Sequence, residues 1–180
     1  MTSAPKPRHA SSIRASSVAT TTRLARLTGA EAHLLSAPGV AQSREAKLVL
    51  LGDTYVRQTM ELFSRITLAI VGIGAMEPSG MLARSGNVFS SRELAEVAEA
   101  GGVGDISLRF FNAEGGFVKT PLHDRVIGMT LEELSKVDRV IALAGGRSKT
   151  EAIRGALRTG VIDLLITDRF TAERLLEAQA

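Results

Sequence analysis

The residues best suited to binding a small anion stand together in the segment Ala144-Gly145-Gly146-Arg147-Ser148-Lys149. An apolar run ends there, two glycines follow, and the pattern predicts a helix with Lys149 in its first turn. Amide groups at a helix start lack intrahelical acceptors and carry the positive end of the helix dipole, so they favour an anion. The segment therefore fits a phosphate site, although it fits a plain strand-to-helix turn with a solvated lysine as well. It matches neither the NTPase phosphate loop nor a dinucleotide fingerprint.

Two further residues are candidates for the same site. A second glycine turn, Gly72-Ile73-Gly74, leads into a loop that contains Arg84, which could meet a phosphate or a hydroxyl or could be a surface arginine. Asp105 follows Val103-Gly104, and a carboxylate there could accept hydrogen bonds from vicinal sugar hydroxyls or simply form a turn. If the preceding strands are parallel, their carboxyl ends meet at one edge of the sheet, where ligands bind in open α/β folds.

Other chemistry is poorly supported. The chain has no cysteine, and its three histidines lie too far apart for the paired spacings of a zinc site, so neither a metal nor a cofactor is expected. His123 stands alone in a polar loop and is interpreted as a surface residue. Asp53, Asp163 and Asp168 are interpreted as caps or turn formers. No Ser–His–Asp order or carboxylate pair indicates a catalytic centre.

Composition indicates one soluble globular domain. The chain has 180 residues, 44% hydrophobic and 23% charged, with a formal net charge of +3. Its apolar runs are too short for a membrane helix, and only 4% of residues are aromatic, which argues against a nucleic-acid platform. We therefore expect a cytoplasmic protein with no membrane partner.

The order of elements predicts an α/β fold. Three short, nearly continuous apolar runs, at residues 67–73, 139–144 and 161–167, have the pattern of strands buried on both faces of a parallel sheet. A weaker strand candidate covers residues 32–35. Residues 104–118 predict a hairpin or extended arm, because an Asn-Ala-Glu-Gly-Gly turn separates two short apolar stretches.

Helices are predicted between these strands. Capping boxes precede three of them, with Ser90 and Glu93, Thr130 and Glu133, and Ser148 and Glu151 as the paired residues. Further helices are expected after Asp53, over residues 16–27 and over residues 169–177.

In several of these segments the chain resembles the sugar-binding effector domain of the SorC/DeoR-type bacterial transcriptional regulators. The matching stretches occur in order and include residues 34–38, 69–74, 102–106, 109–112, 125–128, 140–146, 149–153 and 164–168. The resemblance implies an α/β fold with a Rossmann-like, mostly parallel sheet flanked by helices, similar to the phosphosugar isomerase and glucosamine-6-phosphate deaminase fold.

The same resemblance implies a non-enzymatic sensor of a phosphorylated sugar, and a homo-oligomer. By position, the phosphate-binding element of the family falls on Gly145, Gly146 and Lys149. Its acidic sugar-contacting residue falls on Asp105, and a basic loop residue falls approximately on Arg84.

Two departures from the family pattern lead to further expectations. The chain shows no N-terminal helix-turn-helix, so contact with DNA is expected only through that missing element. Residues 1–15 are expected to be a disordered or remnant segment, and residues 16–180 an effector domain shortened at its N-terminus, lacking one strand. Two alternatives stay open: a sugar-phosphate isomerase or deaminase that uses Asp105, and a vestigial fragment that only oligomerises.

Overall fold

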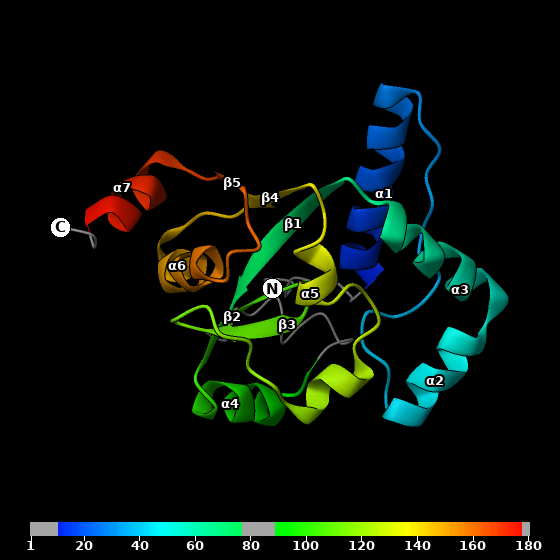
Figure 1. Ribbon diagram of the computed structural model, residues 1–180, viewed down its shortest axis with the longest axis horizontal. Helices are drawn as coiled ribbons and strands as arrows, with labels where there is room; N and C mark the ends of the chain where they lie inside the picture. Colours follow the sequence, from blue (N-terminus) through cyan, green and yellow to red (C-terminus); the bar gives the residue numbers. More distant parts are fainter. Residues whose placement is uncertain (1–10, 77–88, 178–180) are drawn as a thin grey trace, which may run out of the picture.

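One five-stranded sheet organises the molecule. The structure, a computed structural model, describes residues 11–76 and 89–177, with side chains from residue 18 onward. Within this part, the strands are ordered β3-β2-β1-β4-β5 (Figure 1). They are β1 (Leu68–Ala75), β2 (Gly102–Ile106), β3 (Arg109–Asn112), β4 (Arg139–Leu143) and β5 (Leu164–Ile166).

Four of these five strands run in the same direction. β1 pairs in parallel with β4, and β4 with β5, whereas β2 is antiparallel to both β1 and β3. The α/β fold and the three strands predicted from apolar runs are thus confirmed.

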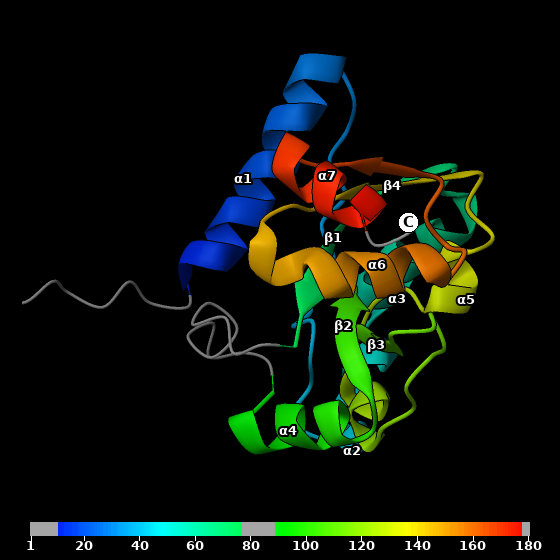
Figure 2. The same ribbon diagram turned by 90° about the vertical axis from the view of Figure 1, so that its left-hand side faces the viewer.

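Helices surround the sheet. Helices α1 (Ser11–Thr28), α2 (Arg44–Gly52) and α3 (Thr54–Glu61) gather on one side of the view in Figure 1, and α6 (Thr150–Arg158) and α7 (Arg169–Glu177) on the other. Figure 2 views the molecule from the side on which α6 and α7 lie. Helix α4 (Ser91–Glu99) lies near the hairpin, and the short α5 (Leu131–Leu134) lies beside the sheet (Figure 1). Three 3₁₀ turns cover Leu62–Arg65, Pro121–Arg125 and Arg147–Lys149.

Most of the predicted helix starts are confirmed. Ser90 and Thr130 open α4 and α5 with complete capping boxes, and Asp53 caps α3 by accepting hydrogen bonds from two amides. The box expected at Ser148 and Glu151 is wrong. Ser148 lies inside a 3₁₀ turn, and Lys149 is the N-cap residue of α6.

Two hydrophobic clusters form the core. The first lies where α5 and α6 cover one face of the sheet, and it contains Ile73, Ile106, Phe111, Val140 and Ile153 among its buried members. The second packs on the other face of the β2–β3 hairpin. Its buried residues are Val40, Phe89, Val97, Phe110, Val118, Leu122 and Val126. The hairpin is therefore covered from both sides.

The opposite face of β1, β4 and β5 is open among the described residues. The register places Ile70, Ile141 and Leu164 in one row, and Leu143 and Ile166 in the next. The side chains of Ile70, Leu143, Leu164 and Ile166 are each about half exposed, at 54%, 48%, 47% and 51%. We refer to this surface, together with Leu68, as the open face.

Part of β1 also lacks a neighbour. Strand β2 pairs only with Ile73–Ala75, so no described strand pairs with Leu68–Gly72 on that side. The strand predicted at residues 32–35 is wrong, since those residues have no regular structure. A strand needs a neighbour to satisfy its backbone groups, and none of the described residues provides one there.

The glycines and the hairpin turn also differ from expectation. Gly72 and Gly74 belong to β1 itself and do not form a turn. The β2–β3 turn falls on Ser107 and Leu108, both with positive φ, of 52° and 63°. The predicted Asn-Ala-Glu-Gly-Gly turn follows β3, where Phe117 forms a bridge back to Phe111.

Candidate functional site

Asp105 and Lys149 meet at the carboxyl end of β1. The Lys149 Nζ donates a 2.9 Å hydrogen bond to the carbonyl of Ile73. Asp105, on β2, is paired with the next residue of β1, Gly74. Burial raises the pKa of the Asp105 carboxyl, and the Lys149 charge offsets part of that rise. Asp105 on antiparallel β2 and Lys149 in the connection between β4 and α6 therefore lie at the same edge of the sheet.

Gly74 makes room for the Asp105 side chain. A Cβ atom at Gly74 would collide with Oδ1 of Asp105, so any larger residue there would displace the Asp105 carboxylate from its present position. The glycine that the sequence assigned to a turn therefore lets an acid lie over the end of the neighbouring strand.

The Asp105 carboxyl is partly buried. It accepts a 2.9 Å hydrogen bond from the Leu108 amide. Burial raises the pKa of Asp105 above its usual value, and the Leu108 amide and the Lys149 charge offset that shift only in part. The carboxyl is short of partners for its charge, a condition that hydroxyl groups of a bound molecule would relieve.

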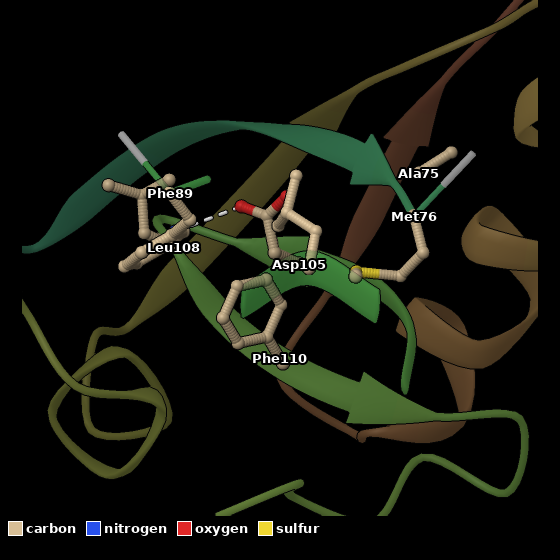
Figure 3. Close-up of a pocket in the computed structure, with 7 residues that line it drawn as sticks. Ala75, Met76, Phe89, Asp105, Leu108 and Phe110 are labelled. Atoms are coloured by element: carbon tan, nitrogen blue, oxygen red, sulfur yellow. Dashed lines mark hydrogen bonds between the residues drawn. The ribbon is translucent and has the colours of Figure 1, made fainter. Parts of the chain in front are cut away.

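A small pocket adjoins Asp105. Its volume is about 10 Å³, room for one water-sized group. Figure 3 shows the Asp105 carboxyl between Leu108 and the Met76 side chain, with Phe110 below it. The other lining residues are Ala75, Phe89 and Leu94. The acid is therefore the one charged group in a wall of apolar side chains from β1, β2, β3 and α4.

The Gly145-Gly146 turn differs from the predicted phosphate cradle. The Gly146 amide already donates to Asp168 Oδ2 and to Thr171 Oγ1, each at 2.9 Å. It is therefore not free to bind an anion, because the cap of α7 already satisfies it. Gly146 has φ 100° and nothing within 4 Å of the position of a Cβ, so open space lies beside its Cα.

The next two amides in the turn remain available. Within the described part of the chain, neither the Arg147 nor the Ser148 amide donates to another residue, whereas the Lys149 amide donates to the Gly146 carbonyl. An anion at this helix start would meet these two amides and the Lys149 ammonium group.

Other residues singled out by sequence have different positions. Arg84 lies outside the described residues. His123 is not a surface residue: its ring packs on Phe117 and Phe110, at centroid distances of 4.5 and 5.8 Å. Its Nδ1 accepts from the Thr120 amide, and burial lowers the pKa of its imidazole.

Asp53 and Asp168 cap helices, as predicted, whereas Asp163 bonds to the neighbouring strand β4. Asp163 accepts a 2.7 Å hydrogen bond from the Val140 amide, and Asp168 accepts from the Thr171 amide at the start of α7. Sequence reasoning did not connect Asp168 with Gly146. Asp168 and Thr171, three positions apart just after a strand, form a pattern typical of a helix cap. That pattern does not reveal that Asp168 also accepts from the amide of Gly146, 22 residues earlier.

Neither metal binding nor membrane insertion finds support in the described residues. No group of three or more His, Asp or Glu residues in 11–76 and 89–177 is arranged to hold a metal ion. Within the same ranges, no helix combines the length and apolar character that a membrane crossing requires.

The mixed α/β sheet thus places an acid and a lysine at the end of its central strand. Residues 4–177 match the family model described as "Putative sugar-binding domain". The chain belongs to this family, whose members here are domains of SorC/DeoR-type transcriptional regulators.

Individual relatives are transcriptional regulators. The chain is 38% identical over 154 residues to the erythritol catabolism regulatory protein EryD of Brucella abortus, covering 86% of this chain and 48% of that protein. It is 32% identical over 142 residues to the deoxyribonucleoside regulator of Bacillus subtilis, covering 79% and 45%. The full-length sorbitol operon regulator SorC of Klebsiella pneumoniae superposes with a TM-score of 0.76 at 27% identity, covering 82% and 48%.

These relatives establish the class of the chain and its extent. They are regulators, which places the chain among non-enzymatic regulator domains. The chain spans about half the length of the curated relatives that it matches. The likeness to the phosphosugar isomerase fold stays a prediction.

Proposed function

We propose that the chain binds a phosphorylated sugar or sugar alcohol as the effector domain of a transcriptional regulator. The observation that carries this proposal is the convergence of Lys149 and Asp105 on the last residues of β1. A cation and a hydroxyl-accepting acid at one strand end suit a molecule that has an anionic group at one end and hydroxyls at the other.

In the proposed complex the phosphoryl group lies at the start of α6. The Arg147 and Ser148 amides donate to it, and Gly145 and Gly146 allow it to approach the backbone. An ammonium group has three donors, so Lys149 can keep its bond to the Ile73 carbonyl and still contact a phosphate. Arg84 is a further proposed contact, from outside the described residues.

Asp105 is proposed to accept hydrogen bonds from the hydroxyls of the ligand. The apolar walls beside it exclude water and strengthen those hydrogen bonds. The names of two relatives refer to erythritol and to deoxyribonucleosides, compounds with hydroxyl groups on a short carbon chain or on a sugar ring. They support a ligand of that size.

In an intact regulator, ligand binding would favour one arrangement of subunits and so change DNA binding. The DNA contact would come from a helix-turn-helix outside the chain, in the cytoplasm. We further propose a homo-oligomer in which the open face of one copy packs on the open face of another. The face is mostly aliphatic, with Arg139 in register with Leu68 at one end, and a twofold interface would bring the aliphatic side chains of two copies together.

Titration calorimetry with paired probes tests the ligand proposal. The probes are erythritol, erythritol 4-phosphate, deoxyribose 5-phosphate and inorganic phosphate. We expect at least one sugar phosphate to bind more tightly than its unphosphorylated form. Lys149→Met should weaken both the sugar phosphate and inorganic phosphate about tenfold or more, because a charge-assisted contact is lost.

Two variants sharpen this test. Asp105→Asn should weaken the sugar phosphate and leave inorganic phosphate unchanged, because Asp105 is assigned to the hydroxyls. Lys136→Met removes an exposed lysine that pairs only with Glu132, so it is the matched control and should bind normally. Equal affinities of the wild type and Lys149→Met for every probe would refute the proposed site.

A further inference from the structure

The start of helix α7 is bonded directly to the turn assigned to the ligand. The Gly146 amide donates to two acceptors at once, Asp168 Oδ2 and Thr171 Oγ1, both at 2.9 Å. Both acceptors belong to the α7 cap, where the Thr171 amide donates to Asp168 Oδ1 at 2.9 Å. One short polar cluster therefore closes the α7 helix start and fixes a residue at the end of β4.

The cluster continues to helix α6. The Thr171 hydroxyl donates to Asp168 Oδ2 at 2.6 Å, and Arg174 Nη2 donates to Thr171 Oγ1 at 3.0 Å. Arg174 Nε also donates to the hydroxyl of Thr150, the first residue of α6, at 3.2 Å. Thr171 is completely buried, so its hydroxyl depends on these partners alone. The network thus joins the turn, α6 and α7 through the side chains of Asp168, Thr171, Arg174 and Thr150.

On its α6 side the turn has its own bonds, from the Lys149 amide to the Gly146 carbonyl and from the Thr150 hydroxyl to the Arg147 carbonyl, but the Gly146 amide is fixed by the α7 cap. Gly146 has φ 100° and ψ 147°, lies outside the β4–β5 ladder, and contacts no side chain at the position of a Cβ. A Cβ at Gly145 would collide with the Asp168 carboxylate, so Asp168 also packs against the preceding glycine. A glycine pair has more backbone freedom than any other dipeptide, and two hydrogen bonds to one amide remove much of that freedom.

We infer that Asp168 and Thr171 are positioning residues for the ligand site, a role that rests on the proposed function. They do not touch the phosphoryl group. They hold Gly146 in one conformation, which fixes the positions of the Arg147 and Ser148 amides and of Lys149 that follow it. When only a fraction of molecules has a competent turn, the apparent dissociation constant rises by the inverse of that fraction. Loss of the hydrogen bonds from the Gly146 amide to Asp168 and Thr171 should therefore weaken binding without removing any ligand contact.

A pair of substitutions at Thr171 separates this role from simple packing. Thr171→Val keeps the buried shape and removes the hydroxyl, whereas Thr171→Ser keeps the hydroxyl and removes a buried methyl group. We expect Thr171→Val to weaken erythritol 4-phosphate and inorganic phosphate about tenfold, the scale of one hydrogen bond. Thr171→Ser should bind close to the wild type. If affinity instead follows melting temperature through both variants, the role is structural and the inference is wrong.

A second measurement needs no ligand. The Gly146 amide should be protected from hydrogen exchange in the wild type and in Thr171→Ser, and should lose protection in Thr171→Val. If Thr171→Val does not fold, Asp168→Ala at an exposed position serves instead, with the same expected loss. Unchanged protection of Gly146 overturns the inference whether or not any probe binds. Conversely, if Gly146 is protected in the wild type and loses protection in Thr171→Val, but the wild type binds no sugar phosphate, only the proposed function is contradicted.

Discussion

The two ends of the sheet are buried to different extents. At the hairpin end, Phe111 of β3 points into the cluster beneath α6, and its neighbour Phe110 points into the cluster beside α4. At the parallel end, Val140 of β4 is buried beneath the helices while Leu143 of the same strand is 48% exposed on the open face. The hairpin end therefore has the environment of a finished core, and the parallel end has that of a half-covered sheet.

The two ends of the sheet therefore have different roles: the hairpin end contributes to the stability of one copy, and the parallel end is available for contact between copies. Apolar residues covered on both sides of a sheet contribute about 25 cal/mol for each Å² removed from water. The aliphatic side chains of the open face gain little in a single copy, and a contiguous apolar surface of that kind marks an interaction site. The proposed binding site lies at the boundary, where β2 meets the last residues of β1.

The largest effect is expected at the hairpin end. Phe111→Ala should destabilise the protein by about 3–5 kcal/mol, because Phe111 is fully buried and fills the space over Gly104 and Gly155. Urea unfolding followed by circular dichroism measures this loss. A loss of less than about 1 kcal/mol would show that the hairpin end is no better packed than the parallel end.

A matched pair in β4 tests the two faces of the parallel end. Val140→Ala should cost about 2 kcal/mol, because it removes methyl groups that are 1% exposed. Leu143→Ala should change the unfolding free energy by less than about 0.5 kcal/mol at a concentration where the protein is monomeric.

The same pair tests the proposed oligomer. In sedimentation velocity, Leu143→Ala should weaken self-association, while Val140→Ala should leave it unchanged. A wild-type protein that stays monomeric at every concentration, or association that Leu143→Ala does not alter, would reject the open face as a contact between copies.

The smallest effect is expected from titration of Asp168, the carboxylate in the α7 cap that binds the Gly146 amide. Hydrogen bonds from the Thr171 side chain and amide, with help from the Gly146 amide, lower the pKa of Asp168 to about 2. Because the pKa of Asp168 in the folded protein lies below the usual value of 3.8, its hydrogen bonds stabilise the fold fully above about pH 4. That stabilisation is lost as pH falls through about 2.

The Gly146 amide resonance reports this titration. Its chemical shift should move with a midpoint near pH 2, while amides of the β2–β3 hairpin stay unchanged over the same range. A midpoint near pH 4 would mean that Asp168 is not bonded to Gly146 in solution.

Local signals predicted most elements correctly. The capping boxes at Ser90 and Thr130 formed because each needs only residues three positions apart. The same signal failed at Ser148, where the preceding glycine turn redirects the chain into a 3₁₀ turn. The strand at residues 32–35 failed because a strand depends on a neighbour that local pattern does not reveal.

The candidate site was predictable in part. Lys149 and Asp105 could be named as candidates because each follows glycine near a strand. Their convergence required the antiparallel pairing of β2 with β1, which places Asp105 opposite Gly74. The partner of the Gly146 amide could not be anticipated, since Asp168 and Thr171 reach it only after β5 pairs with β4.

By itself, the sequence determined the α/β class, the three parallel strands, most of the helix caps and the residues that we propose for binding a phosphorylated sugar. These properties depend on spacings of a few residues, because the geometry of a helix, a strand or a cap is set by residues close together in the chain. Only the tertiary structure decided that β2 runs against β1, that one sheet face stays open, and that the α7 cap occupies the Gly146 amide. Each of these depends on contacts between residues far apart in the chain, whose pairing is chosen by the packing of the whole domain.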